Sequence, residues 1–121
     1  MKILLDENIP FAEELFGSLG AVTEAPGRSV DERYRGLDQF DALAIRSVTK
    51  VTPALVDRAV RCRVIATATI GVDHIDTAYI RQVNPRRERP ITVVSAPGAN
   101  ADSVADYVAF ALAHLAQREG R

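Results

Sequence analysis

The chain has 121 residues, of which 47% are hydrophobic and 26% are charged, and its formal net charge is −1. These totals predict a folded globular domain with a core of its own, and they argue against a disordered chain or one that binds nucleic acid through bulk positive charge. No apolar run approaches the roughly 18 residues of a membrane span. The N-terminal stretch turns acidic too soon for a signal peptide. We therefore expect a cytoplasmic protein with no membrane contact.

The single cysteine, Cys62, has no partner for a disulfide within the chain. It lies among residues that favour strands, so we expect a buried structural thiol. A lone unpaired thiol also fits a reducing compartment.

Short apolar runs alternate with helical patterns along the chain. Four runs are typical of strands buried on both faces, and one weaker run also favours a strand: residues 3–5, 42–45, 64–66 and 91–94, with the weaker one at 21–24. Residues 25–40 and 84–90 are expected to be loops, the second a solvated surface rather than a phosphate site. This alternation predicts an α/β fold with a parallel sheet and helices on both faces.

Three helices are predicted between these strands. The first follows Pro10, the second opens at Pro53, and the third begins near Asp73, which is placed to cap it. Their expected inward-facing residues are Phe11, Leu15 and Leu19 in the first, Leu55, Val56, Ala59 and Val60 in the second, and Ile75 and Tyr79 in the third.

A last helix is expected over residues 101–116, and its pattern differs from the others. It is apolar nearly all round, whereas a helix lying on one small domain needs a single apolar stripe. Its second face therefore calls for a following domain or another subunit.

Polar residues follow the predicted strand at 42–45. They are Arg46-Ser47-Val48-Thr49-Lys50, which suit a small anion such as a carboxylate or phosphate. The same residues also fit a plain capping segment before the helix at Pro53, and their spacing leaves both interpretations open.

The next strand also ends in hydroxyls, at Thr67 and Thr69. Thr69 is either a ligand contact or an ordinary strand-end hydroxyl, and its chemistry alone does not decide. His74 lies between Asp73 and Asp76, which suggests a metal cluster. A capping cluster is favoured, because such close neighbours do not converge on one face of a helix.

Two other nucleotide- or phosphate-related functions find no support in these residues. Asp6-Glu7-Asn8 would suit the Mg²⁺ site of a phosphorylatable receiver domain, but Arg46 stands where such a domain needs its acceptor aspartate. None of the seven glycines lies in a G-x-G-x-x-G fingerprint or a P-loop, so the chain shows no dinucleotide site of its own.

Four segments, residues 1–10, 44–51, 66–76 and 95–101, resemble the D-isomer-specific 2-hydroxyacid dehydrogenases, in order and over nearly the whole chain. Residues 67–74, which read Thr-Ala-Thr-Ile-Gly-Val-Asp-His, are most similar to the members that oxidise 4-phosphoerythronate in pyridoxal phosphate biosynthesis (pyridoxine biosynthesis). Phosphoglycerate dehydrogenases usually have Asp-Asn in place of Asp-His. The chain departs from the family in its long basic 84–90 connection and in Ala99, where a cysteine is common.

The resemblance implies a flavodoxin-like substrate-binding domain at residues 1–100, and a long helix at 101–121 that leads to a separate NAD-binding domain beyond this chain. It makes Ser47 and Thr69 substrate contacts and Arg46 a partner for the substrate's anionic groups. The family's catalytic residues belong to the part beyond this chain, so the chain alone is expected to be inactive. The complete enzyme would be a homodimer. Alternatives are another family member, such as a phosphoglycerate dehydrogenase, and a standalone anion-binding module.

Overall fold

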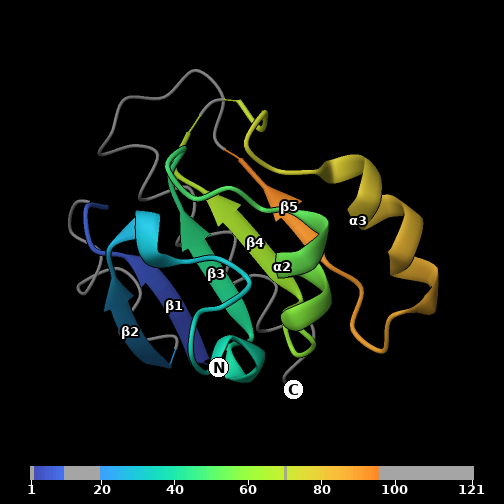
Figure 1. Cartoon of the computed structure of the whole chain (residues 1–121), viewed down its shortest axis with the longest axis horizontal. Coiled ribbons are helices and arrows are strands. Elements are labelled where there is room, and N and C mark those ends of the chain that lie inside the picture. Colours follow the sequence, from blue (N-terminus) through green and yellow to red (C-terminus); the bar gives the residue numbers. More distant parts are fainter. Residues whose placement is uncertain (1, 10–19, 70, 96–121) are drawn as a thin grey trace.

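A computed structural model describes residues 2–9, 20–69 and 71–95. These residues hold five strands in one sheet: β1 (Lys2–Asp6), β2 (Ala21–Ala25), β3 (Ala42–Ile45), β4 (Val64–Thr67) and β5 (Thr92–Val94). All neighbouring pairs are parallel, and the spatial order is β2-β1-β3-β4-β5 (Figure 1). The five expected strands and the parallel α/β sheet are therefore confirmed, and the order is that of flavodoxin-like sheets.

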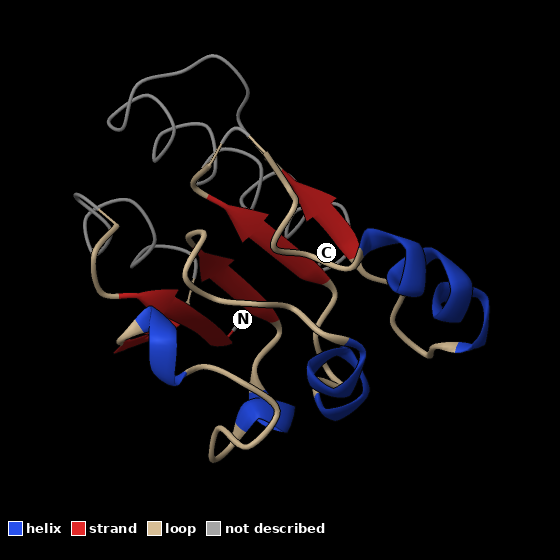
Figure 2. Ribbon diagram, turned by 45° about the horizontal axis from the view of Figure 1, so that its top comes forward, coloured by secondary structure: helices blue, strands red, loops and turns tan. Residues whose placement is uncertain are grey.

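Two α-helices lie among the described residues, α2 (Pro53–Arg58) and α3 (Thr77–Val83), together with single 3₁₀ turns at Gly27–Ser29, Leu37–Gln39 and Asn84–Arg86 (Figure 2). Within these ranges no helix has the length and apolar character to cross a membrane. α2 begins where the sequence predicts, because the Thr52 hydroxyl accepts a hydrogen bond from Leu55 N at 3.2 Å. The prediction for Val60 is wrong: α2 ends at Arg58, and Val60 is 57% exposed.

The core lies on both sides of the sheet. On one face α2 and α3 pack against the central strands, in a cluster that includes Leu4, Leu43, Ile45, Ile65, Leu55, Val56 and Ile80. The alternate strand residues, which point to the opposite face, are also at most 1% exposed: Ile3, Leu5, Ala44 and Val64. Burial on both faces is thus confirmed for β1, β3 and β4, whereas β5 is only partly buried. The helices predicted at 11–19 and 101–116, and with them the long terminal helix, lie outside the described residues.

Arg87 ties the 84–90 connection to the end of α2. Its guanidinium donates to the carbonyl oxygens of Val56 (3.2 Å), Ala59 (2.9 Å) and Cys62 (2.9 Å). These include carbonyls that the end of a helix leaves without partners. The connection is therefore partly anchored, although Glu88 and Pro90 remain exposed as expected.

Cys62 is fully buried, and its thiol donates to Val64 O at 3.3 Å. Burial raises the pKa of this thiol to about 12, so it stays protonated and unreactive at neutral pH. The expectation of a structural thiol is confirmed.

Candidate ligand-binding site at the carboxyl edge of the sheet

The chain order places a topological switch point between β1 and β3. From β1 the sheet extends to β2 on one side and to β3 on the other, and all the strands end at the same edge. Open α/β sheets bind ligands just beyond the carboxyl ends of strands at such a point. The residues that follow β1, β3 and β4 are therefore the first candidates for a site.

Asp6 and Arg46 meet at this switch point. Arg46 Nε lies 3.2 Å from Asp6 Oδ2, and the Asp6 side chain is only 1% exposed, whereas that of Arg46 is 33% exposed. Asp6 Oδ1 accepts from Asn8 N at 2.8 Å. Neither Asp6 Oδ2 nor Arg46 Nε makes a well-directed hydrogen bond among the described residues. The pair is thus a buried charge contact whose cationic partner still reaches the surface.

Gly27 packs directly against this pair. A Cβ at position 27 would overlap Asp6 Oδ2 and lie 2.6 Å from Val48 Cγ2, so only glycine fits there. Thr49, itself buried, donates its hydroxyl hydrogen to Gly27 O at 2.9 Å. An open hollow of about 310 Å³ lies beside them, lined by Asn8, Pro26, Gly27, Arg28, Arg46 and Val48. Two arginines line this hollow, which suits a small anion.

A second group of polar side chains follows β4. Thr67 Oγ1 lies 2.6 Å from Thr69 Oγ1 and 2.9 Å from His74 Nε2, and Thr69 Oγ1 donates to Gly71 O at 2.8 Å. Thr67 is fully buried and Thr69 partly so. The hydroxyl at Thr69 is therefore held by its neighbours rather than free to rotate.

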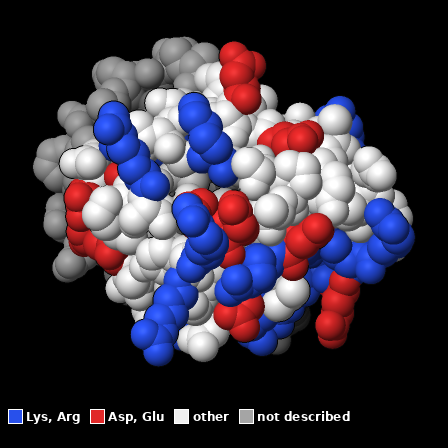
Figure 3. All heavy atoms as spheres, viewed as in Figure 1, with Lys and Arg blue, Asp and Glu red and all other residues white. Residues whose placement is uncertain are grey.

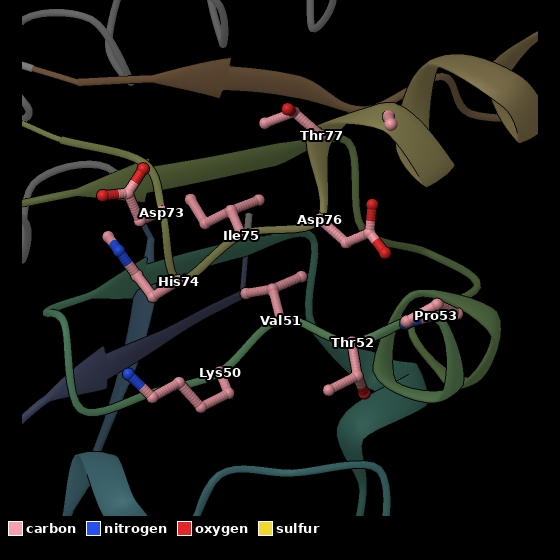
Figure 4. Close-up of a pocket in the computed structure, with 10 residues that line it drawn as sticks. Lys50, Val51, Thr52, Pro53, Asp73, His74, Ile75, Asp76 and Thr77 are labelled. Carbon is pink, nitrogen blue, oxygen red and sulfur yellow. The ribbon is translucent and has the colours of Figure 1, made fainter.

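A groove of about 720 Å³ runs beside His74, between the segments that follow β3 and β4 (Figure 4). The two segments are joined through Val51, whose N donates to His74 O at 2.8 Å and whose O accepts from Asp76 N at 3.0 Å. Burial and the charge of Lys50 lower the pKa of His74, and together they outweigh the charge of Asp73, which raises it. His74 is therefore a neutral imidazole at neutral pH.

The structure corrects three expectations for residues 73–76. The third helix begins at Thr77 rather than near Asp73, because Asp73 and His74 form a turn and Ile75 pairs with Val51. Its cap is Asp76, which accepts from Tyr79 N at 3.0 Å, and not Asp73. Ile75 is buried in the pairing with Val51 instead of lying on the helix. Among the described residues no group of histidine, cysteine and acidic side chains could hold a metal ion.

The structure brings the three sequence-predicted site residues to one edge of the sheet. Ile45 pairs in register with Thr67, and Ala68 N donates to Ile45 O at 2.8 Å, so Ser47 and Thr69 follow neighbouring strands at the same level. Ser47 is exposed, and its carbonyl accepts from Lys50 Nζ at 3.0 Å. That their side chains and Arg46 converge on one ligand stays a prediction.

The sequence names Asp6 and Thr67, but it predicts neither the contact of Asp6 with Arg46 nor that of Thr67 with His74. The acidic run at residues 6–8 suggests only a Mg²⁺ ligand for Asp6, although its place at the end of a buried strand predicts low exposure. Thr67 and Thr69 are two residues apart on one strand end, and this spacing puts both side chains on the same face. That spacing was the available signal for their contact.

Comparison with known proteins shows to which protein family this chain belongs. The family model for the D-isomer specific 2-hydroxyacid dehydrogenase, catalytic domain, matches residues 3–119. The chain therefore belongs to the D-isomer specific 2-hydroxyacid dehydrogenases.

Within this family the chain is a homologue of the erythronate-4-phosphate dehydrogenases. The protein of that name from Chromohalobacter salexigens is 45% identical over 120 residues, which are 99% of this chain and 29% of the relative. That from Cellvibrio japonicus is 47% identical over 115 residues, 95% of this chain and 28% of the relative. The chain thus spans less than a third of the length of these curated relatives.

Solved structures share the fold. A 2-hydroxyacid dehydrogenase from Ketogulonicigenium vulgare superposes with a TM-score of 0.59 at 25% identity, over 98% of this chain and 36% of that chain. The D-lactate dehydrogenase from Aquifex aeolicus, solved with NAD and lactic acid, gives a TM-score of 0.63 at 23% identity, over 98% of this chain and 34% of that chain. The described sheet therefore has the 2-hydroxyacid dehydrogenase fold.

Proposed function

We propose that this chain is the substrate-binding part of an NAD-dependent dehydrogenase that oxidises 4-phosphoerythronate at C2. The observation that carries the proposal is the near-complete match of the chain to erythronate-4-phosphate dehydrogenases, together with polar residues gathered at the carboxyl edge of the sheet. Residues 1–100 would form the substrate-binding domain, and residues 101–121 a helix that connects it to the NAD-binding part.

In this proposal the chain binds and orients the substrate. Arg46 faces the substrate's anionic groups, while Ser47 and Thr69 contact it from neighbouring strand ends. The buried Asp6 carboxylate holds the inner end of Arg46 at 3.2 Å and so orients a side chain whose outer part is exposed. When bound, NAD supplies the hydride acceptor. The chain lacks a dinucleotide fingerprint, so no residue here is assigned to NAD, and we expect the chain by itself to be inactive.

The remaining features of the proposal concern partners and location. The complete enzyme would be a cytoplasmic homodimer that acts on a small anionic hydroxy acid. On the face seen in Figure 3, lysine and arginine side chains are interspersed with aspartate and glutamate. A mixed surface of this kind suits a small anionic substrate better than a nucleic acid backbone, which needs a continuous basic face.

A chimeric enzyme tests the proposal. This chain would replace the matching 120 residues of the Chromohalobacter salexigens relative. We expect the chimera to reduce NAD with 4-phosphoerythronate and much less with 3-phosphoglycerate, as followed by NADH absorbance. The chain alone should give no NADH. A chimera that folds, binds NAD and prefers 3-phosphoglycerate would favour the phosphoglycerate dehydrogenase alternative.

A matched variant tests the site. Arg46→Lys keeps a cation beside Asp6 but loses the fork that binds two oxygens at once, so it should raise the KM for 4-phosphoerythronate about tenfold and leave NAD affinity unchanged. A standalone anion-binding module would behave differently: the chain alone would then bind inorganic phosphate as tightly as 4-phosphoerythronate, as measured by calorimetry.

A further inference from the structure

The hydrogen bonds beyond β4 form one continuous line from His74 through Thr67 and Thr69 to Gly71 O. Its three links measure 2.9, 2.6 and 2.8 Å, so each is a good hydrogen bond. A threonine hydroxyl carries a single hydrogen, and a backbone carbonyl oxygen only accepts. These two facts are enough to decide which way every link runs.

The direction follows from the Gly71 end. Thr69 gives its hydrogen to Gly71 O, so between the two hydroxyls Thr69 must accept and Thr67 must donate. The hydroxyl hydrogen of Thr67 is then donated to Thr69, so Thr67 must accept in its contact with His74, and His74 Nε2 must carry the proton. A neutral imidazole with hydrogen on Nε2 satisfies every link, whereas the other tautomer would leave two lone pairs facing each other across one of them.

This order determines what Thr69 can offer to a ligand. Its hydrogen is taken by Gly71 O, and one of its lone pairs is taken by Thr67. One lone pair is left, so Thr69 presents an acceptor. Thr67 is 0% exposed, so solvent does not compete for its hydroxyl, while Thr69 is partly exposed. An acceptor repels carboxylate and phosphate oxygens and attracts a hydroxyl group.

We propose that His74 and Thr67 hold the Thr69 hydroxyl as a hydrogen-bond acceptor, which selects substrates that carry a second hydroxyl beside the reacting one. This inference rests on the proposed function, and it makes His74 and Thr67 positioning residues. The reacting C2 hydroxyl must pass its proton to a general base, so an acceptor elsewhere that held that hydrogen would oppose the reaction. Thr69 therefore serves the 3-hydroxyl of 4-phosphoerythronate, a group that 3-phosphoglycerate lacks.

The hydrogen bonds that join His74, Thr67, Thr69 and Gly71 O are called the relay below. The tautomer of His74 tests this relay without any substrate. Nitrogen NMR of the 121-residue chain should show the Nε2–H form of His74, with His114→Gln used to remove the signal of the second histidine. Thr67→Val removes the acceptor, so His74 should then show a mixture of tautomers. An Nδ1–H form in the chain with Thr67 intact would overturn the relay.

Substrate selectivity of the chimeric enzyme tests whether Thr69 accepts a hydrogen bond from the 3-hydroxyl of the substrate. The probe is 2-hydroxy-4-phosphobutanoate, which lacks the 3-hydroxyl but keeps the charges of 4-phosphoerythronate. We expect its KM to be about tenfold higher, which is the effect of one hydrogen bond. Thr69→Val should abolish the difference by raising only the KM for 4-phosphoerythronate, and Thr69→Ser should keep it. His74→Phe should reduce the difference, and His74→Gln, which still has an N–H donor, should restore it.

The outcomes separate this inference from the proposed function. A chimera that oxidises both compounds with the same KM, or one in which Thr69→Val keeps the difference, overturns the role of Thr69 as a selective acceptor and leaves the proposed function standing. A chimera that folds and binds NAD but does not oxidise 4-phosphoerythronate overturns the proposed function. The tautomer of His74 then still decides whether the relay exists.

Discussion

Asp6 and Asp41 are two buried aspartates at opposite ends of the sheet, and their surroundings differ. Asp41, just before β3, accepts hydrogen bonds from Lys2 N (2.8 Å), Arg89 Nη1 (2.9 Å) and Arg61 Nη2 (3.3 Å). Asp6, at the carboxyl end of β1, accepts from Asn8 N and has only a charge contact with Arg46. One of its oxygens has no hydrogen bond among the described residues.

This difference is the one expected if the amino end carries a structural ion network and the carboxyl edge binds a ligand, as proposed. At the amino end both oxygens of the Asp41 carboxylate accept hydrogen bonds, one of them from Arg89 in the 84–90 connection. At the carboxyl end the pairing is incomplete, and Arg46 reaches a hollow that a small anion can enter. Native proteins satisfy buried polar groups almost everywhere, so an unsatisfied buried oxygen beside a cation is informative.

The largest effect is expected from Arg46→Ala. It would leave the buried Asp6 carboxylate without its cation, and breaking a buried pair from one side costs about 3–5 kcal/mol of unfolding free energy. Urea denaturation at pH 7 measures this loss. Asp6→Asn in the same background should recover part of it, because the remaining group is then neutral. A loss below about 1 kcal/mol would mean that the pair is not buried as described.

Asp41→Asn should cost less, roughly 2 kcal/mol at pH 7, since a neutral amide retains one acceptor. Burial would raise the pKa of Asp41, but the Lys2 N–H and the charges of Arg61, Arg63 and Arg89 outweigh it and lower the pKa below the ordinary 3.8. The carboxylate's contribution is therefore complete above pH 3.8 and is lost as the pH falls through the lower pKa of the folded state.

The unfolding free energies of the parent chain and Asp41→Asn should thus converge in acid, which urea titrations at several pH values would show. Ligand binding should be unaffected, because Asp41 lies at the end of the sheet remote from Arg46. A difference that grows toward low pH would contradict the sign of the pKa shift.

The smallest effects should come from the exposed arginines around Asp41. Arg61 is 52% exposed with a 3.3 Å contact, so Arg61→Ala should cost no more than about 0.5 kcal/mol. Arg89 is 35% exposed with a 2.9 Å contact, so Arg89→Ala should cost somewhat more, about 1 kcal/mol. Urea denaturation in low and high salt would rank them, and both losses should shrink in high salt. Equal and salt-independent losses would show that packing dominates.

β1, β3 and β4 were predictable because buried strands produce uninterrupted apolar runs, whereas β2 and β5 are only partly buried. The start of α2 was predictable from Thr52-Pro53. Val60 was misplaced because its spacing fits a helix that ends before it. The start of α3 was misplaced for a different reason: Val51, from a distant part of the chain, pairs with Ile75 and hydrogen-bonds to the backbone of His74 and Asp76. A local pattern contains no information about such a pairing.

The sequence by itself determined the class of fold, the buried thiol of Cys62 and the presence of polar groups after three strands, because each depends on the order and type of neighbouring residues. Only the tertiary structure decided their partners. Asp6 and Arg46 are 40 positions apart and meet through the pairing of β1 with β3. Val51 pairs with the backbone of residues 74–76, and His74 is there a partner of Thr67 rather than a member of a capping cluster. The direction of the hydrogen bonds among His74, Thr67 and Thr69 depends on how these groups are placed together. The sequence therefore shows which donors and acceptors exist, and the fold determines how they pair.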